Sequence, residues 1–198
     1  MLDSVKLDLQ FDPRRLKRDL KQLPSGAWID HFVKRNYDGD WSVIPLRAAA
    51  GATHPVMMIY SDPGCQEFAD TPFLDQCPYS RAVLQAFACE LQAVRLMKLS
   101  PGSSIREHAD HDLAAENGTA RLHVPIVTND GVDFRLNGRR IVMNEGECWY
   151  LRLSDPHSVE NNGRSDRVHL VIDAVVNDWL AAQLGGAVSP AGRRAGMV

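Results

Sequence analysis

The residues of this chain that are best suited to chemistry are two histidines and an aspartate, which are common metal ligands. His108 and Asp110 are two positions apart, so on an extended segment the imidazole and the carboxylate point to the same side. With 7 His and 25 Asp+Glu among 198 residues, about one His-x-Asp/Glu pair is expected by chance. Two other residues strengthen the interpretation of this pair as metal ligands. They are His157, which follows a Ser-Asp-Pro turn, and Arg167, which begins an apolar segment.

Two histidines and one carboxylate form the facial triad of non-haem Fe(II) oxygenases, which leaves three coordination positions open. Those positions suit a chelating keto acid and dioxygen, and a buried arginine can pair bidentately with the other end of the keto acid. We therefore expect His108, Asp110 and His157 to bind a metal and Arg167 to bind a co-substrate. The alternative for His108 and Asp110 is an ordinary surface pair at a sheet edge.

Three further polar residues lie within apolar, strand-like segments. Arg121 and His123 share one face of their segment, which is either an inward binding face or the solvated side of a half-exposed sheet. No acidic residue occupies a neighbouring inward position on that segment, so a ligand carboxylate is the simplest expected partner of Arg121. We expect Arg121 to bind the substrate and His123 to bind co-substrate or substrate. Arg95 is either a second substrate-binding residue or half of a surface ion pair.

The first half of the chain predicts helices mixed with a few strands. Residues 5–11 alternate apolar and polar side chains, as a half-buried strand does. Asp12 and Pro13 then suit the start of a helix that ends before Pro24. Short strands are predicted at 41–46 and 56–60, and a second helix at 78–90.

The second half predicts closely spaced strands separated by turns. Asn137-Gly138 is the strongest hairpin signal, because a type I′ turn needs positive φ at both central residues. This pattern favours a mainly β (α+β) sandwich or jelly-roll barrel, with helices of the first half covering one face. The predicted strands are 91–99, 104–107, 120–128, 132–136, 139–143, 147–153 and 166–175.

Composition predicts one globular domain and excludes several classes of protein. Hydrophobic residues make up 44% and charged residues 24% of the chain, and the formal net charge is −3. These values exclude a mainly disordered chain and give no overall field that attracts nucleic acid or an anionic membrane. No apolar stretch reaches the roughly 20 residues that span a bilayer, and no secretory signal is visible, so we expect a cytoplasmic protein. The four cysteines form no CxxC pair and are expected to be free thiols.

The order of several short motifs resembles the aspartyl/asparaginyl/proline hydroxylase family of 2-oxoglutarate-dependent oxygenases. The resemblance covers roughly residues 40–179, and is greatest to the bacterial free-proline 4-hydroxylases, which share the Gly39-Asp40-Trp41 element. Asp110 is present here, whereas the animal peptide hydroxylases of the family lack this carboxylate. Met97 departs from the family, which has a serine there that helps hold the keto acid. The motifs are Ser100-Pro101-Gly102, His108-Ala109-Asp110, Arg121-Leu122-His123-Val124, Gly146-Glu147-Cys148-Trp149-Tyr150-Leu151, Pro156-His157-Ser158 and Arg167-Val168-His169-Leu170-Val171-Ile172-Asp173.

The resemblance implies a double-stranded β-helix, a cupin-like jelly roll, within a single domain spanning 1–198. Residues 1–90 would form a covering layer, 91–176 the core, and 177–198 a short helix and a flexible tail. The implied cofactors are Fe(II), 2-oxoglutarate as co-substrate and dioxygen. The implied reaction is hydroxylation of an unactivated carbon of a free amino acid or related small molecule. The alternatives are a peptidyl Asp/Asn-type hydroxylase and a cupin-like module that binds a metal or ligand without oxidising it.

Overall fold

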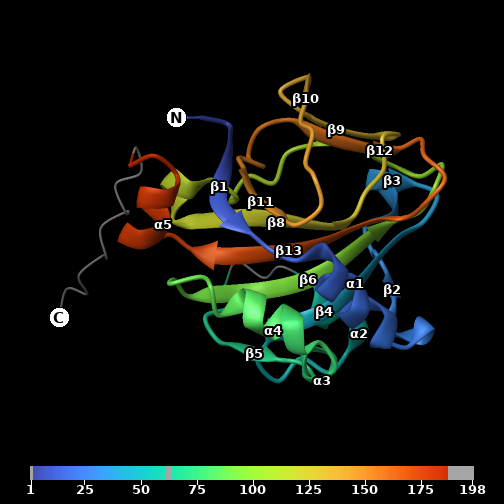
Figure 1. Ribbon diagram of the computed structural model, residues 1–198, viewed down its shortest axis with the longest axis horizontal. Helices are drawn as coiled ribbons and strands as arrows, with labels where there is room; N and C mark the ends of the chain where they lie inside the picture. The colour runs from blue at the N-terminus through green and yellow to red at the C-terminus, as the bar shows by residue number, and fades with distance from the viewer. Residues whose placement is uncertain (1, 61–63, 187–198) are drawn as a thin grey trace.

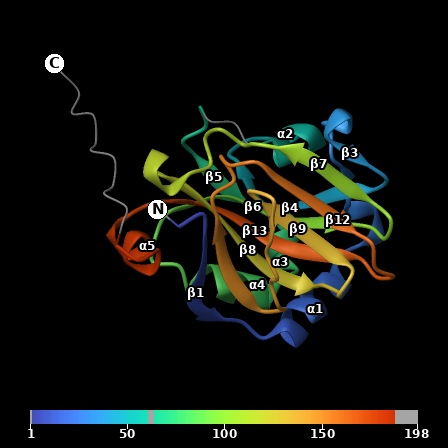
Figure 2. The ribbon, with the colours of Figure 1, turned by 90° about the horizontal axis from the view of Figure 1, so that it is seen from above.

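The computed structural model describes residues 2–60 and 64–186, which form two facing antiparallel β-sheets and a layer of helices (Figure 1). The larger sheet has eight strands in the order β1-β11-β8-β13-β6-β4-β2, with β5 paired to β4. The smaller sheet has five strands in the order β10-β9-β12-β7-β3. Seen from above, β9 and β12 lie over β8 and β13 (Figure 2).

The strand bounds are as follows. The larger sheet contains β1 (Ser4–Gln10), β2 (Ile29–Asp30), β4 (Trp41–Ala49), β5 (Phe68–Asp70), β6 (Leu91–Leu99), β8 (Thr119–Val127), β11 (Glu147–Leu151) and β13 (Arg167–Val175). The smaller sheet contains β3 (Tyr37–Asp38), β7 (Ser104–His108), β9 (Val132–Leu136), β10 (Arg139–Arg140) and β12 (His157–Asn161).

Helices α1, α3 and α4 cover the outer face of the larger sheet, away from the smaller sheet (Figure 1). Helix α1 begins where the Asp12 side chain accepts hydrogen bonds from the first backbone N–H groups and Pro13 occupies the first turn. A last helix, α5, lies beyond β13. The helix bounds are α1 (Pro13–Gln22), α2 (Pro55–Ile59), α3 (Pro72–Asp75), α4 (Pro78–Leu84) and α5 (Asp178–Gln183).

Alternation along β8 and β13 separates an apolar face from a polar one. Leu122 and Val124 of β8 pack into the core between the larger sheet and the helices, and Leu170 and Ile172 of β13 join them there. The residues between them in sequence point to the other face, toward the smaller sheet. A second apolar cluster, which includes Phe134 and Leu136, fills part of the space between the sheets. The polar residues of β8 and β13 therefore lie inside the sandwich beside this cluster.

Most predicted strands of the second half are present, and both residues of the predicted type I′ turn have positive φ, 53° at Asn137 and 73° at Gly138. The prediction of a strand at 56–60 is wrong, because this segment lies in helix α2 and its C-cap. Its N-cap is His54, whose Nδ1 accepts from the Val56 N–H, and Pro55 occupies the first turn. The second predicted helix stops at Leu84 rather than at residue 90.

Three other expectations need correction. Residues 1–90 do more than cover the core, because β1 pairs with β11 and β4 pairs with β6 within the larger sheet. The strand expected at 139–143 is only two residues long, and β12 was not predicted. Of the tail expected to be flexible, residues 187–198 lie outside the described part of the chain. None of the helices within residues 2–60 and 64–186 combines the length and apolar character needed to cross a membrane.

Candidate metal centre

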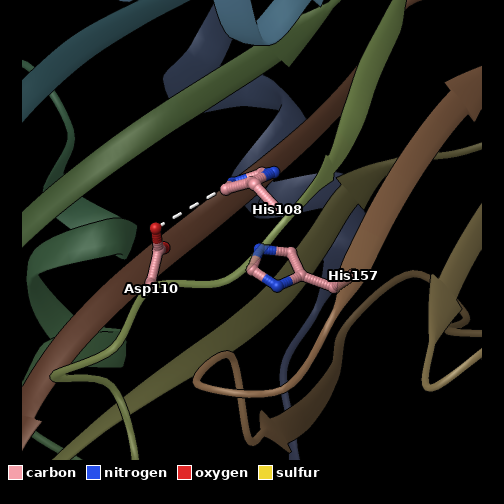
Figure 3. Close-up of side chains that lie close together, drawn as sticks. All are labelled: His108, Asp110 and His157. Atoms are coloured by element: carbon pink, nitrogen blue, oxygen red, sulfur yellow. Dashed lines mark ion pairs between the residues drawn. The ribbon is translucent and has the colours of Figure 1, made fainter.

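The structure brings His108, Asp110 and His157 together at one end of the smaller sheet (Figure 3). His108 ends β7 and His157 begins β12, and the two residues are direct partners in the antiparallel register. One possible ligand atom from each of the three side chains lies within 4.8 Å of the other two. The Nε2 atom of His108 is 3.9 Å from Oδ1 of Asp110.

Backbone carbonyls orient both imidazoles for metal binding. Nδ1 of His108 is 2.8 Å from the carbonyl oxygen of Arg106, and Nδ1 of His157 is 3.0 Å from that of Asp155. A carbonyl only accepts, so each Nδ1 carries the proton and each Nε2 keeps its lone pair for a ligand bond. Burial also lowers the pKa of His157, which favours the neutral form that binds metals. Two Nε2 atoms and one carboxylate oxygen fit a first-row divalent ion with open positions.

Beside this cluster, a carboxylate holds two arginines inside the sandwich. Asp173 accepts from Nε of Arg121 at 2.6 Å and from Nη2 of Arg121 at 3.0 Å. It also accepts from Nη2 of Arg95 at 3.1 Å. Burial by itself raises the pKa of Asp173, but the charges of Arg121 and Arg95 outweigh it and hold the pKa at about 2. Asp173 is therefore ionised at neutral pH.

Arg167, the first residue of β13, is another buried cation that lines the cavity. It is 2% exposed, and no described carboxylate lies within ion-pair distance of it. Its Nη2 donates to Nδ1 of His169 at 3.0 Å, whereas its buried Nε has no hydrogen-bond partner among the described residues. Burial lowers the pKa of Arg167 to about 9. A buried cation in such surroundings favours binding of an anion.

His123 lies next to this cation. Nδ1 of His123 is 3.4 Å from Nδ1 of His169, which already accepts from Arg167, so His123 must donate there and keep its Nε2 unprotonated. Burial, and after it the charge of Arg167, lowers the pKa of His123 well below its usual value. Its buried Nε2 has no partner among the described residues, which leaves one acceptor for a ligand or water.

A cavity of about 680 Å³ joins these groups. Its volume is within the usual range for small-molecule sites. An aromatic wall lines one side, where His31 stacks on Trp41 with ring centroids 3.6 Å apart and planes inclined by 6°. All the site residues expected from the sequence line the cavity: His108, Asp110, His157, Arg167, His123, Arg121 and Arg95.

The structure also corrects part of the expectation for the arginines. Arg95 is 1% exposed, so it is not half of a surface ion pair. A ligand carboxylate was the simplest expected partner of Arg121, but Asp173 neutralises it from the adjacent strand and Asp110 also accepts from it at 3.1 Å. The substrate-binding role of Arg121 stays a prediction. Asp173 and His31 were missed as site residues. The signal for Asp173 was its parity with Arg167, because residues an even number apart on one strand share a face.

Comparison with known proteins shows the family of this chain. The sequence profile of the aspartyl/asparaginyl β-hydroxylase family matches residues 11–176. The chain belongs to this family. It is a hydroxylase family of the 2-oxoglutarate- and Fe(II)-dependent oxygenase class, as the sequence resemblance implies.

The chain has a distant relative of described activity, the L-proline cis-4-hydroxylase of Rhizobium meliloti (strain 1021). The two are 27% identical over 172 residues, which cover 83% of this chain and 58% of the relative. The chain therefore spans little more than half of the relative's length.

Two solved structures show the fold of this chain. One is an oxidoreductase of the 2OG-Fe(II) oxygenase family from Burkholderia pseudomallei, with a TM-score of 0.55 and 14% identity over 82% of this chain and 78% of that one. The other is AviO1 from Streptomyces viridochromogenes Tue57, with a TM-score of 0.52 and 10% identity over 89% of this chain and 90% of that one. The predicted double-stranded β-helix is thereby confirmed.

Proposed function

We propose that this protein uses Fe(II) and 2-oxoglutarate to hydroxylate an unactivated carbon of a free amino acid or a related small molecule. The observation that carries this proposal is the meeting of two kinds of group in one cavity. One is a His-Asp-His cluster with both Nε2 atoms available, and the other is a buried arginine, Arg167, with no described carboxylate beside it. An oxygenase of this class needs both a metal triad and a cation for the keto acid.

The metal, when bound, supplies dioxygen activation coupled to oxidative decarboxylation of 2-oxoglutarate. His108, Asp110 and His157 would hold it, and the Nδ1 hydrogen bonds to backbone carbonyls keep both imidazoles in the ligating orientation. The chain itself binds and orients the metal, the co-substrate and the substrate, and it excludes water. The difficult chemistry belongs to the cofactors.

Arg167 would bind the distal carboxylate of 2-oxoglutarate. Its buried guanidinium offers parallel N–H donors that match a carboxylate, and the low polarity around it strengthens a charge-assisted bond. His123 lies beside it with one acceptor nitrogen buried, so it would take part through a bound water or a ligand hydroxyl. A metal-binding module that does not oxidise its ligand would leave this buried cation without a role.

Arg95 and Arg121 would bind the carboxylate of the substrate. Both line the cavity with the triad, and Asp173 holds them side by side, so one carboxylate can approach both. The stacked rings of His31 and Trp41 offer an apolar wall for the rest of a small substrate. A cyclic amino acid such as proline, the substrate named for the relative, suits these two features.

The test is succinate release from 2-oxoglutarate by the protein with Fe(II), measured across a panel of free amino acids that includes proline. Mass spectrometry of the amino acid should show a gain of one oxygen atom in step with succinate. A His157→Ala variant is the control for metal-independent background. Failure of every free amino acid, together with turnover of a peptide panel, would transfer the proposal to a peptidyl substrate. Failure of both panels would refute it.

A further inference from the structure

Asp173 occupies a special position in the larger sheet. It lies on β13, and its direct partner in the register on β8 is Arg121. On the other side of β13, Arg95 of β6 pairs with Val171, so it is the diagonal neighbour of Asp173. One buried carboxylate, 4% exposed, therefore lies between two arginines from the two flanking strands.

The network continues from Arg121 to the metal triad. Nη1 of Arg121 donates to Oδ2 of Asp110 at 3.1 Å, and the other oxygen, Oδ1, is the one nearest to His108. The two Asp110 oxygens thus have different environments. A guanidinium on Oδ2 fixes the rotation of the carboxylate and leaves Oδ1 for a single bond to a metal.

The hydrogen bonds between Asp173 and Arg121 determine how Arg121 contacts Asp110. Asp173 accepts from Nε and Nη2 of Arg121 in a bidentate pair. Nη1 of the same guanidinium donates to Asp110. Without the charge of Asp173, the guanidinium can turn and engage Asp110 through both prongs. It would then compete with a divalent ion for the same carboxylate.

We infer that Asp173 is a positioning residue of the metal centre, which acts through Arg121 to present Oδ1 of Asp110 to the metal. The inference rests on the proposed function, because it assumes that the triad binds a divalent ion. Asp173 would contact neither the metal nor the co-substrate, but it would set the geometry of the ligand Asp110.

The test is calorimetric titration of Mn(II) into the protein without 2-oxoglutarate. Asp173→Asn keeps the size of the side chain and removes its charge, and we expect the Mn(II) affinity to fall about tenfold, the lower range for partners that orient a ligand. Asp19→Asn is the matched control. Asp19 is also buried, at 3% exposure, and accepts from N and Oγ of Ser80, but it lies on α1 outside the cavity. We expect the control to lose stability but keep the wild-type Mn(II) affinity.

The double variant distinguishes positioning from general support of the fold. If Asp173 acts through Arg121, then Asp173→Asn should cost no further Mn(II) affinity once Arg121→Gln is present, because the competing guanidinium is gone. Additive losses in the double variant, or an unchanged affinity in Asp173→Asn, would overturn the inference.

Two further outcomes are also decisive. If Asp173→Asn does not fold, Asp173→Glu keeps the charge but moves it by one methylene, and it should still weaken Mn(II) binding; wild-type affinity there would refute positioning. If the wild-type protein itself binds no Mn(II), the proposed function fails first. If the wild type binds Mn(II) and the Asp173 variants bind it with the same affinity, the inference fails but the proposed function stands.

Discussion

His108 and His157 face each other as direct partners on the neighbouring antiparallel strands β7 and β12, with ring centroids 4.3 Å apart. Two strands therefore fix the relative position of these histidines, and only Asp110 comes from the segment after β7. The backbone N–H of Asp110 donates to the carbonyl of Leu153 at 2.8 Å, which ties this segment to the chain just before β12. Strand pairing and this hydrogen bond thus fix most of the geometry of the site.

This arrangement predicts that the site can be emptied without unfolding the protein. His157→Ala removes one imidazole and should weaken Mn(II) binding by more than about 100-fold, beyond the usual effect of residues that only support a ligand. The strand pairing of β12 relies on backbone bonds and should persist. Calorimetry gives the affinity and circular dichroism the fold. Tight Mn(II) binding by a folded variant would show that the three residues do not form the metal site.

Arg167 should govern the co-substrate and not the metal. Arg167→Met removes the cation but fills similar space, and it should weaken 2-oxoglutarate binding to the Mn(II)-loaded protein by about 2 kcal/mol or more, roughly thirtyfold. Mn(II) affinity should be unchanged. Arg167→Lys should recover only part of the loss, because an ammonium does not form the bidentate pair.

The same Arg167→Met variant should be more stable than wild type when 2-oxoglutarate is absent. The pKa of Arg167 is lowered to about 9 because burial penalises its charge, and no described carboxylate offsets that penalty. Thermal unfolding of the metal-free proteins measures the difference. A lower melting temperature for the variant would mean that the contact with His169 matters more to stability than the buried charge.

Glu147 should make the fold sensitive to acid. It accepts from the backbone N–H of Asn144 at 2.8 Å and from Nε1 of Trp149 at 2.9 Å. Burial alone raises the pKa of Glu147, but the hydrogen bonds from Asn144, Trp149 and Lys6 prevail and lower it from 4.5 to about 2. The folded state thus favours the ionised form, so this stabilisation is complete above pH 4.5 and is lost as pH falls through about 2.

The measurement is urea unfolding of wild type and Glu147→Gln between pH 7 and pH 2. At pH 7 the variant should be less stable by about 1 to 3 kcal/mol, and the gap should close as the pH falls. A gap that stays constant with pH would assign the effect to packing and not to the charge.

The sequence predicted the strands of the sandwich and the triad better than the contacts between strands. Alternation and turn residues reveal a strand locally, and the spacing of His108 and Asp110 reveals a shared face. The pairing of Asp173 with Arg121 depends on the register between β13 and β8, which no local pattern encodes. The error at 56–60 has another cause, because a short apolar run resembles a strand, whereas His54 and Pro55 begin a helix there.

The two arginines beside Asp173 should separate into different roles. Arg121 donates hydrogen bonds to both Asp173 and Asp110, whereas Arg95 donates to Asp173 and acts on Asp110 through its charge. Arg95→Gln should therefore keep Mn(II) affinity within about twofold of wild type, because Asp173 still holds Arg121 through two hydrogen bonds. It should raise the KM for the amino-acid substrate about tenfold or more, since a charge-assisted bond to the substrate carboxylate is lost.

The comparison variant is Arg121→Gln, which should change both quantities. It removes a donor to the substrate carboxylate and also the hydrogen bond that orients Asp110, so the Mn(II) affinity should shift along with the KM. The KM is measured with the substrate found in the amino-acid panel, and Mn(II) affinity by calorimetry on the same preparations. Equal changes in Mn(II) affinity for the two variants would mean that the contact between Arg121 and Asp110 does not set the metal site, and that both arginines act only as a shared source of positive charge.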